Sequence, residues 1–297
     1  MAQRQDHPVL IEVALNGVSR QKRNRNVPIS VDEIVRDSVA CLKGGAQIIH
    51  QHDDLGSEGE LGGASPEEMA AKSGAVYERV LSEHPDALLY PTANWGGTHE
   101  ERWRHQEILK DQGLLRMAFL DPGSVNLGVQ GPSGIPERGF VYDHGFDEVR
   151  RLFERAEEKK LAPNMAIFEP GFLRTILAYE SAGKLPAGSF AKLYFGDRVL
   201  FGHPPTRKAL EAYLELLDGS RLVWAVAVLG GDVIRSGMAR WALESGGHLR
   251  IGLEDYAGPG SPSNSDLLEQ AITLCEQVGR PLASSSEAAE LLEVPVR

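Results

Sequence analysis

The sequence is poor in cysteine and in aromatic residues, and it has no long apolar run. Only two of its 297 residues are cysteines, Cys41 and Cys275, and both fall in helical patterns, so a disulfide framework is not expected. No stretch approaches the roughly 18 apolar residues of a membrane-spanning helix, and the first residues lack the basic-then-apolar pattern of a signal peptide. We therefore expect a cytoplasmic protein without a membrane partner.

Positive charge is also scarce. Lysine and arginine number 31 against 42 acidic residues, which gives a formal net charge of -11. Binding to nucleic acid requires clustered basic side chains, so we expect no nucleic-acid partner. One basic loop does exist, and we expect it either to be solvated or to bind an anionic substrate or cofactor. It contains Arg20, Lys22, Arg23 and Arg25.

Short apolar runs alternate with longer amphipathic stretches along the whole chain. This alternation predicts parallel strands joined by crossover helices, and eight such units close a (β/α)8 TIM barrel, here as a single domain over residues 1–297. Ser30 and Glu33 form a capping-box pattern at the first helix. The expected strands are 9–15, 46–52, 87–92, 114–120, 164–169, 191–201, 221–228 and 248–251. The expected helices are 30–43, 66–83, 100–112, 145–160, 171–181, 204–219, 232–243 and 264–278, and a Gly-rich excursion precedes the fourth of them.

Active sites of such barrels lie at the carboxyl ends of the strands, so polar residues there are the candidates for chemistry. They are His50, His52, Thr92, Asn94, Ser124, Asn126, Glu169, His203, Arg250, Glu254 and Asp255.

His50 and His52 are the strongest pair. Residues two apart on a strand project from one face, so both imidazoles can point into the barrel mouth. Two imidazoles with one carboxylate form an open zinc site, although an isolated HxH pattern also arises by chance. The carboxylates that can complete the site are Glu12, Asp53, Asp54, Glu169, Glu254 and Asp255.

Charged and hydroxyl side chains at other strand ends have both functional and structural interpretations. Arg250 needs an anionic partner, which is either a substrate carboxylate or Asp255 in a structural ion pair. Glu254 and Asp255 can divide metal binding and proton transfer between them, or cap a helix. Ser124 and Thr92 can contact a substrate, but most such hydroxyls only cap helices.

Several segments occur in an order that resembles the beta-keto acid cleavage enzymes, a family that includes the 3-keto-5-aminohexanoate cleavage enzymes. They are ALNG, VPISVDEIVRDSVACLKGGAQIIHQHDD, PGSVNLG, FEPG, WAVAVLGG and GGHLRIGLEDY, and together they span nearly the whole chain. The resemblance implies a zinc-dependent barrel, usually a homo-oligomer, that condenses a beta-keto acid with acetyl-CoA to give acetoacetate and a new acyl-CoA.

The resemblance also implies roles for individual residues. His50, His52 and Glu254 match the zinc ligands, and Arg250 and Asp255 match the catalytic arginine and aspartate. Glu169 matches an acidic residue in the mouth, to which we assign catalysis, and Ser124 and Thr92 fall at substrate-contacting positions. We also expect Asn126 and Ser19 to contact the substrate.

The sequence departs from the family pattern at three places that bear on the substrate. Ser19 stands where members acting on the aminated substrate have an acid, so the resemblance does not imply 3-keto-5-aminohexanoate. GDRVLFGHPPT replaces a GVPGG run, and WAVAVLGG lacks a following arginine, which alters the distal pocket and the coenzyme A entrance.

Two other function classes remain open on the residues alone. A metal-dependent hydrolase acting on a small carboxylate would use the same mouth to generate zinc hydroxide, but barrel hydrolases commonly carry HxH on the first strand rather than the second. A catalytically silent binding protein would have no need to retain Glu254 and Asp255.

Overall fold

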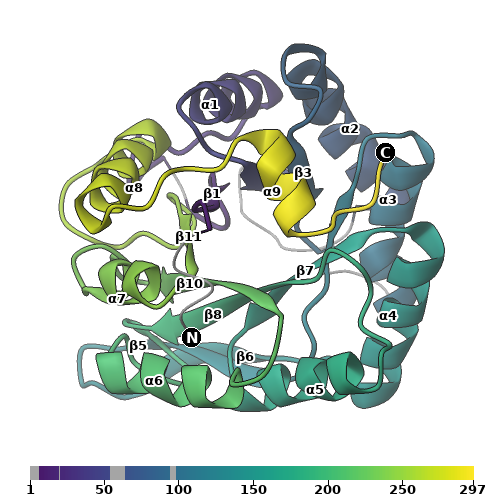
Figure 1. The fold of residues 1–297 in the computed structure, drawn as a ribbon. Coiled ribbons are helices and arrows are strands. Elements are labelled where there is room, and N and C mark those ends of the chain that lie inside the picture. Colours follow the sequence, from purple (N-terminus) through teal and green to yellow (C-terminus); the bar gives the residue numbers. More distant parts are fainter. Residues whose placement is uncertain (1–6, 20, 54–63, 94–97) are drawn as a thin grey trace.

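A computed structural model describes residues 7–19, 21–53, 64–93 and 98–297 of the protein. Its main sheet has eight parallel strands in the order β3-β2-β1-β11-β10-β8-β7-β4 (Figure 1). The strands are β1 (Ile11–Ala14), β2 (Ile48–Gln51), β3 (Leu88–Pro91), β4 (Met117–Phe119), β7 (Ala162–Ile167), β8 (Phe190–Gly196), β10 (Val223–Leu229) and β11 (His248–Ile251).

The two end strands of this order, β3 and β4, contact one another, so the sheet is a nearly closed barrel and the predicted (β/α)8 fold is confirmed. Helices surround it on the outside (Figure 1). In the described part of the chain the surrounding helices are α1 (Val31–Lys43), α2 (Pro66–Glu83), α3 (His99–Asp111), α4 (Phe146–Lys159), α5 (Pro170–Ser181), α6 (Arg207–Leu216), α7 (Met238–Glu244) and α8 (Asn264–Val278), and a further helix, α9 (Ser285–Leu291), lies across one end of the barrel. None of these helices has the length and apolarity needed to cross a membrane.

Local sequence signals set several helix starts. The Ser30 side chain accepts a hydrogen bond from the backbone of Glu33, and the Glu33 carboxylate bonds back to the Ser30 backbone, as the capping-box pattern predicts. The same reciprocal arrangement begins α2 at Ser65 and α3 at Thr98. These caps satisfy amide groups that have no partner inside the helix.

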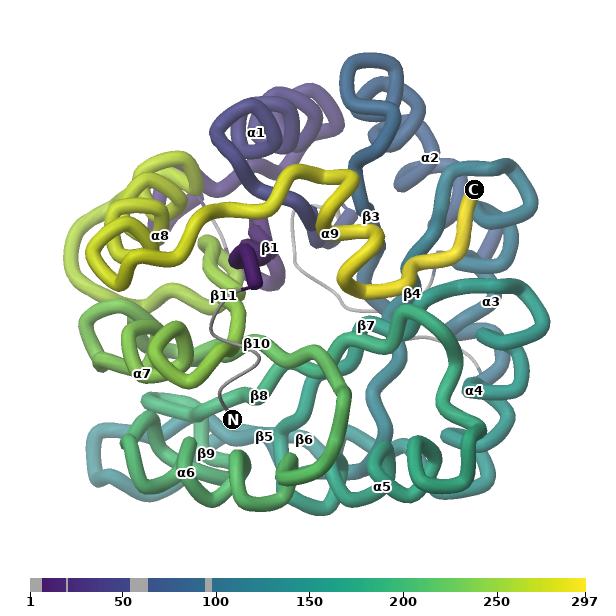
Figure 2. Tube along the Cα trace, in the orientation of Figure 1, coloured from purple at the N-terminus to yellow at the C-terminus, as the bar shows by residue number. Residues whose placement is uncertain are grey.

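The amino-terminal end of the barrel is closed by the C-terminal segment. Residues at or just before the strand starts, such as Leu10, Ile48 and Phe190, form an apolar cluster with Ala288 and Leu292 in and beside α9. Figure 2 shows this segment lying across that end of the barrel. The sequence did not predict α9. Since this end is filled with apolar side chains, a site for polar chemistry has to lie at the opposite end, where the strands finish.

The Gly-rich excursion, in which no strands were expected, forms a β-hairpin. Strands β5 (Val125–Gln130) and β6 (Pro136–Tyr142) pair antiparallel, and β9 (Val199–Leu200) adds a third strand. The expected sixth strand therefore splits into β8 and β9. The chain turns at Gly196, where an added Cβ would lie only 2.1 Å from the carbonyl oxygen of Val199.

The seventh helix begins at Met238 instead of residue 232, which corrects the expected start. The side chain of Asp232 accepts hydrogen bonds from the backbone amides of Ile234 and Arg235, at 2.9 and 3.0 Å. Asp232 thus forms a separate turn before the helix, because aspartate side chains compete for nearby backbone amides.

Candidate active site

A cavity of about 450 Å³ opens at the carboxyl ends of the strands. His50, His52 and Glu254 line it together with Arg250 and Lys192 from the barrel strands. The hairpin β5–β6 contributes a further wall. The cavity therefore unites the predicted metal ligands with two cationic side chains and a lining from the hairpin.

The two histidines and Glu254 meet at close range. Nε2 of His50 lies 3.3 Å from Oε2 of Glu254, and Nε2 of His52 lies 3.4 Å from Oε1. Ligand atoms about 2.0–2.1 Å from a tetrahedral zinc ion lie roughly 3.3 to 3.4 Å apart, so these separations fit one shared ion. Oε2 of Glu254 is buried and has no hydrogen-bond partner among the described residues. The three residues can hold a metal ion.

The protonation states suit a ligand set. Burial lowers the pKa of His50 well below its usual value, so its ring is neutral at pH 7. Nδ1 of His50 lies 3.2 Å from the carbonyl oxygen of Tyr90, which favours a proton on Nδ1 and leaves the Nε2 lone pair toward Glu254. Burial opposes ionisation of Glu254, but Arg250 and the two histidines outweigh it and hold the Glu254 pKa well below normal.

Asn16 and Gly17, which follow β1, hold His52 and Glu254 in place. The side-chain amide of Asn16 donates to the carbonyl of His52, and its oxygen accepts from the His52 amide, at 2.9 and 2.8 Å. Gly17 packs directly against Glu254, where an added Cβ would come within 2.3 Å of the glutamate Cγ. Gly17 also has a φ of +53°, a backbone conformation that favours glycine.

Arg250 is the centre of the electrostatic network. Its buried guanidinium contacts Glu12 at 2.6 Å, Asp255 at 2.8 Å and Glu254 at 3.0 Å. The expected ion pair with Asp255 is therefore present, along with two more carboxylates. Lys192 lies 3.4 Å from Glu12. Three carboxylates thus face two cations, and the excess negative charge suits a bound cation.

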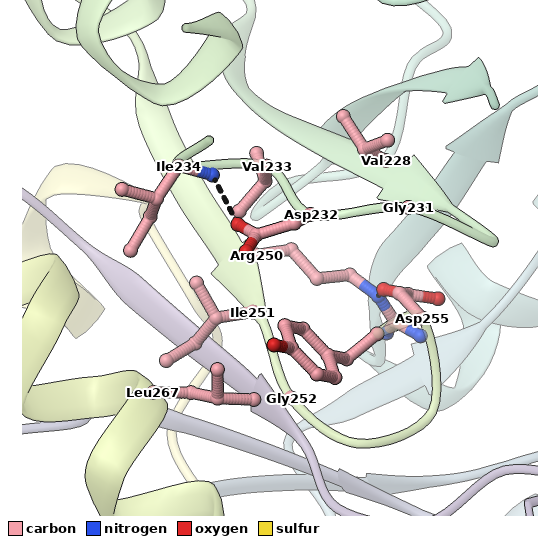
Figure 3. A pocket seen from close by; sticks show the side chains of 11 residues that line it. Val228, Gly231, Asp232, Val233, Ile234, Arg250, Ile251, Gly252, Asp255 and Leu267 are labelled. Carbon is pink, nitrogen blue, oxygen red and sulfur yellow. Dashed lines mark hydrogen bonds and ion pairs between the residues drawn. The ribbon is translucent and has the colours of Figure 1, made fainter. Parts of the chain in front are cut away.

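Asp255 lies on a different side of Arg250 from the large cavity. Its Oδ2 accepts from Nε of Arg250, and Figure 3 shows the carboxylate beside the guanidinium, at the edge of a smaller pocket that also contains Asp232. Burial and neighbouring Glu254 raise the pKa of Asp255 to about 6, in spite of Arg250. Asp255 is not among the residues that line the large cavity, whereas its partner Arg250 is.

Glu12, one of the six carboxylates considered for the metal, has another role. Both of its oxygens are taken: Tyr90 and Arg250 donate to Oε1, and Asn164 donates to Oε2 at 2.9 Å. Burial opposes its ionisation, yet Lys192 and Arg250 lower the Glu12 pKa to about 2. Glu12 is therefore an anion that anchors the cations of the cavity floor.

The other predicted site residues lie in different places. Thr92 is buried and lines the cavity. Ser124 accepts from the amide of His144 and Asn126 borders a hollow on the outside of the hairpin, while Oγ of Ser19 donates to the carbonyl of Leu253. Glu169 accepts from the amide of Gly202 at 3.0 Å. None of these last four lines the cavity, so their contact with substrate stays a prediction.

Of the remaining candidates, some are described by the structure but do not line the cavity, and others lie outside the described residues. Asp53 lies behind the histidines, where its carboxylate accepts from Ser73 at 2.7 Å and from Gln51 at 3.2 Å. Arg23 contacts the carbonyl of Tyr256 at 3.4 Å. His203 stacks edge-on against Tyr213, with ring centroids 5.5 Å apart, which is a structural contact. Three other candidates lie outside the described residues, namely Arg20, Asp54 and Asn94.

Sequence reasoning missed several cavity residues. Lys192 is a charged residue inside the apolar strand FAKLYFG, two positions from Phe190 and Tyr194, so its side chain faces the barrel interior with theirs. A lysine inside an apolar strand could therefore have indicated a functional residue of the barrel interior. Arg138 and Phe140 of the hairpin also line the cavity, but an unrecognised hairpin offers no such signal.

The described residues contain one further cluster of metal-ligating types. His99, His144 and Glu148 each offer an atom within 4.8 Å of the others, as the active-site triad does. This second cluster lies at the starts of α3 and α4, and none of its members lines the cavity.

Comparison with known proteins places the chain in a family. The model of a family described as beta-keto acid cleavage enzyme matches residues 8–294. A 3-oxoadipate:acetyl-CoA acetyltransferase of Cupriavidus necator is 30% identical over 296 residues, covering 97% of this chain and 95% of the relative. A 3-keto-5-aminohexanoate cleavage enzyme of Fusobacterium nucleatum is 25% identical, covering 96% and 98%.

Solved structures agree on the fold. ObcA in complex with oxaloacetate superposes with a TM-score of 0.68 at 17% identity, covering 91% of this chain and 68% of that one. A type I 3-dehydroquinate dehydratase from Clostridium difficile gives 0.55 at 12% identity, covering 92% and 94%. From the extent of the family match and of the curated relatives, the chain belongs to the beta-keto acid cleavage enzyme family.

Proposed function

We propose that the protein condenses a beta-keto acid with acetyl-CoA to give acetoacetate and a new acyl-CoA, with one zinc ion in the active site of each subunit. The observation that carries this proposal is the triad of His50, His52 and Glu254 in the cavity beside Arg250 and Lys192. A metal site next to two buried cations suits a small anionic substrate. The named relatives, one of them an acetyl-CoA acetyltransferase, support the same reaction.

The triad has the ligand types that zinc prefers, two imidazoles and a carboxylate, with room for substrate oxygen. When bound, zinc supplies Lewis-acid polarisation of the keto and carboxylate oxygens. Arg250 and Lys192 line the same cavity and are placed to bind the substrate carboxylate.

The reaction balances as an exchange of acyl groups. C2 of the keto acid gives up a proton and attacks the thioester carbonyl of acetyl-CoA, which releases the coenzyme A thiolate. The thiolate then attacks the original keto carbon, and the bond from that carbon to C2 breaks. C2 regains its proton, so acetoacetate contains the former C1 and C2 together with the acetyl group.

We assign the proton transfer at C2 to Arg250 and Asp255. Arg250 reaches the cavity, and Asp255 lies behind it at 2.8 Å. The guanidinium also offers positive charge to the enolate as it forms. Glu169, the third residue assigned to catalysis, contacts the Gly202 amide outside the cavity wall, and we propose for it a supporting role through that loop.

The residues of the outer cavity wall indicate which acyl chains the substrate can have. Val129, Phe140 and Val199 make it apolar, and Arg138 is its ionised residue. No acid from the hairpin or β9 lines it within the described part of the chain. We propose an acyl chain that is apolar or ends in a carboxylate, because an ammonium group would find no anionic partner there.

Three further features concern partners and compartment. We propose that Lys22, Arg23 and Arg25 attract the phosphates of coenzyme A at the entrance. Exposed apolar side chains on and beside the hairpin, such as Val141 and Phe146, support a homo-oligomer. The buried free thiols of the two cysteines suit a reducing compartment, and we propose the cytoplasm.

A panel of beta-keto acids tests the function. Purified zinc-loaded enzyme is incubated with each acid in the presence and absence of acetyl-CoA, and acetoacetate and acyl-CoA are measured by mass spectrometry. We expect both products only when acetyl-CoA is present. Turnover of the acid without acetyl-CoA would instead support a hydrolase, which the named relatives do not favour.

A further inference from the structure

We propose that His99, His144 and Glu148 form a second site for a divalent transition-metal ion, separate from the active-site triad. His99 begins α3, Glu148 lies in the first turn of α4, and His144 precedes α4. The three contribute two imidazoles and one carboxylate, the ligand types that zinc and its neighbours prefer.

The ligand atoms converge on one small volume. Nδ1 of His99 lies 2.8 Å from Oε1 of Glu148, and Nδ1 of His144 lies 3.2 Å from the same oxygen. Atoms bound to a common metal at about 2.0–2.1 Å lie roughly 2.8 to 3.4 Å apart, depending on the coordination number. Both separations fall in that range.

The hydrogen-bonding state of these atoms argues against a simple ion-pair cluster. The Nδ1 atoms of His99 and His144 and both oxygens of Glu148 are buried without a hydrogen-bond partner among the described residues. The imidazole nitrogens are close to the carboxylate, yet neither contact has the geometry of a hydrogen bond. Close but misaligned donors and acceptors are the arrangement expected around a shared ion, and Oε2 of Glu254 is left without a hydrogen bond in the same way.

Burial makes the empty arrangement costly. The side chains of His144 and Glu148 are only 4% and 7% exposed. A buried carboxylate that lacks hydrogen bonds destabilises the folded protein, and a bound cation removes that cost. The His99 side chain is 41% exposed and Asp143 is 58% exposed, so an ion can enter from the solvent side.

Asp143 and Arg102 complete the surroundings. Asp143 lies 3.8 Å from Nε2 of His99 and 3.8 Å from Nη1 of Arg102. Both distances are too long for a hydrogen bond. Asp143 can therefore contact the metal ion through a water molecule or hold the His99 ring in place. The coordination positions that the three residues do not fill are therefore open to solvent.

The site links the hairpin to the barrel. His144 follows β6, and its backbone amide donates to Ser124 at the start of β5. Its ring packs edge-on against Tyr142, with centroids 4.7 Å apart, and Tyr142 lines the catalytic cavity and donates to Asp121. A metal here would fix the base of the hairpin against α3, and so set the position of one cavity wall.

Metal stoichiometry tests the proposal. Full-length protein stripped with a chelator is loaded with zinc, passed over a desalting column and measured by elemental analysis. We expect two zinc ions per chain in the wild type, one in Glu148→Gln and one in His99→Gln, whose half-exposed position tolerates replacement. His7→Gln, at an exposed histidine outside both clusters, is the matched control and keeps two.

Cobalt(II) titration adds a spectroscopic readout. The visible absorption of the wild type should saturate at two equivalents and that of Glu148→Gln at one, while circular dichroism confirms that the variant is folded. Wild-type and Glu148→Gln protein that both bind one ion, or both bind two, would overturn the proposal. One ion in the wild type that falls to none in Glu148→Gln would support this site and contradict the zinc assignment at His50 and His52.

Discussion

Arg250 donates from Nε to Oδ2 of Asp255 over 2.8 Å, and the two residues are separated in sequence by only the turn that carries Glu254. The same guanidinium contacts Glu254 at 3.0 Å. One buried side chain thus joins the metal site to the residue assigned to proton transfer. We therefore expect replacement of Glu254 to affect metal binding, and replacement of Asp255 to affect proton transfer.

Replacing Asp255 by asparagine should lower kcat about 10²- to 10⁴-fold, because the proton-transfer partner is lost while the metal ligands remain. Zinc content should stay at the wild-type value. Steady-state kinetics and elemental analysis on the same preparations measure both quantities. A variant that lost its zinc would show that Asp255 supports the metal site instead.

Gly17→Ala should remove the active-site metal without touching a ligand. The new Cβ would collide with the Cγ of Glu254, 2.3 Å away, and the φ of +53° adds backbone strain. We expect zinc uptake to fall by one equivalent and activity to be lost. Gly183→Ala, which has a similar φ of +64° but nothing near its Cβ, is the control for strain alone. Equal zinc content in both variants would contradict the packing argument.

The pH dependence of stability should contain a contribution from His105. Burial lowers the pKa of this ring from 6.5 to about 4. The folded protein therefore holds it neutral while the unfolded chain takes up a proton, so its contribution to stability is present above pH 6.5 and is lost as the pH falls toward 4. For a shift of this size the loss is about 3 kcal/mol.

Urea unfolding of wild type and His105→Gln at pH 7 and pH 4 checks this contribution. The decrease in unfolding free energy between the two pH values should be smaller in the variant, whatever its absolute stability. His7→Gln, whose replaced side chain is exposed, is the control. Its unfolding free energy should decrease between pH 7 and pH 4 by as much as that of the wild type. An identical decrease in all three proteins would show that His105 does not titrate as described.

Arg138→Gln should separate two classes of substrate. Arg138 is the ionised residue on the hairpin wall of the cavity, and its removal should raise KM at least about tenfold for acids whose acyl chain ends in a carboxylate. Acids with apolar chains should react with nearly unchanged KM. Parallel kinetics on one substrate of each kind measure the difference, and a uniform change would mean that Arg138 does not contact the chain.

Much of the fold follows from local patterns. Alternation of short apolar runs with longer amphipathic stretches predicted the barrel, and the spacing of His50 and His52 predicted that both rings point into its mouth. The capping box at Ser30 set the start of α1. These features are visible because they depend on residues a few positions apart.

Other features depend on contacts between distant segments. The hairpin was missed because its glycines and exposed strand residues hide the period of two, and β9 pairs with β5 from far along the chain. Helix α9 is too short to stand out, and its role depends on the barrel end that it covers. Strand-end placement left six candidate carboxylates open and the family resemblance pointed to Glu254, but only the folded strands show Glu254 within 3.4 Å of both histidines.

Isotope labelling tests the proposed acyl exchange most directly. Zinc-loaded enzyme is incubated with an unlabelled beta-keto acid and acetyl-CoA carrying ¹³C at both acetyl carbons, and the products are analysed by mass spectrometry and NMR. Acyl exchange predicts acetoacetate labelled at C3 and C4 only, with an unlabelled acyl-CoA. Unlabelled products, or turnover at the same rate without acetyl-CoA, would contradict it.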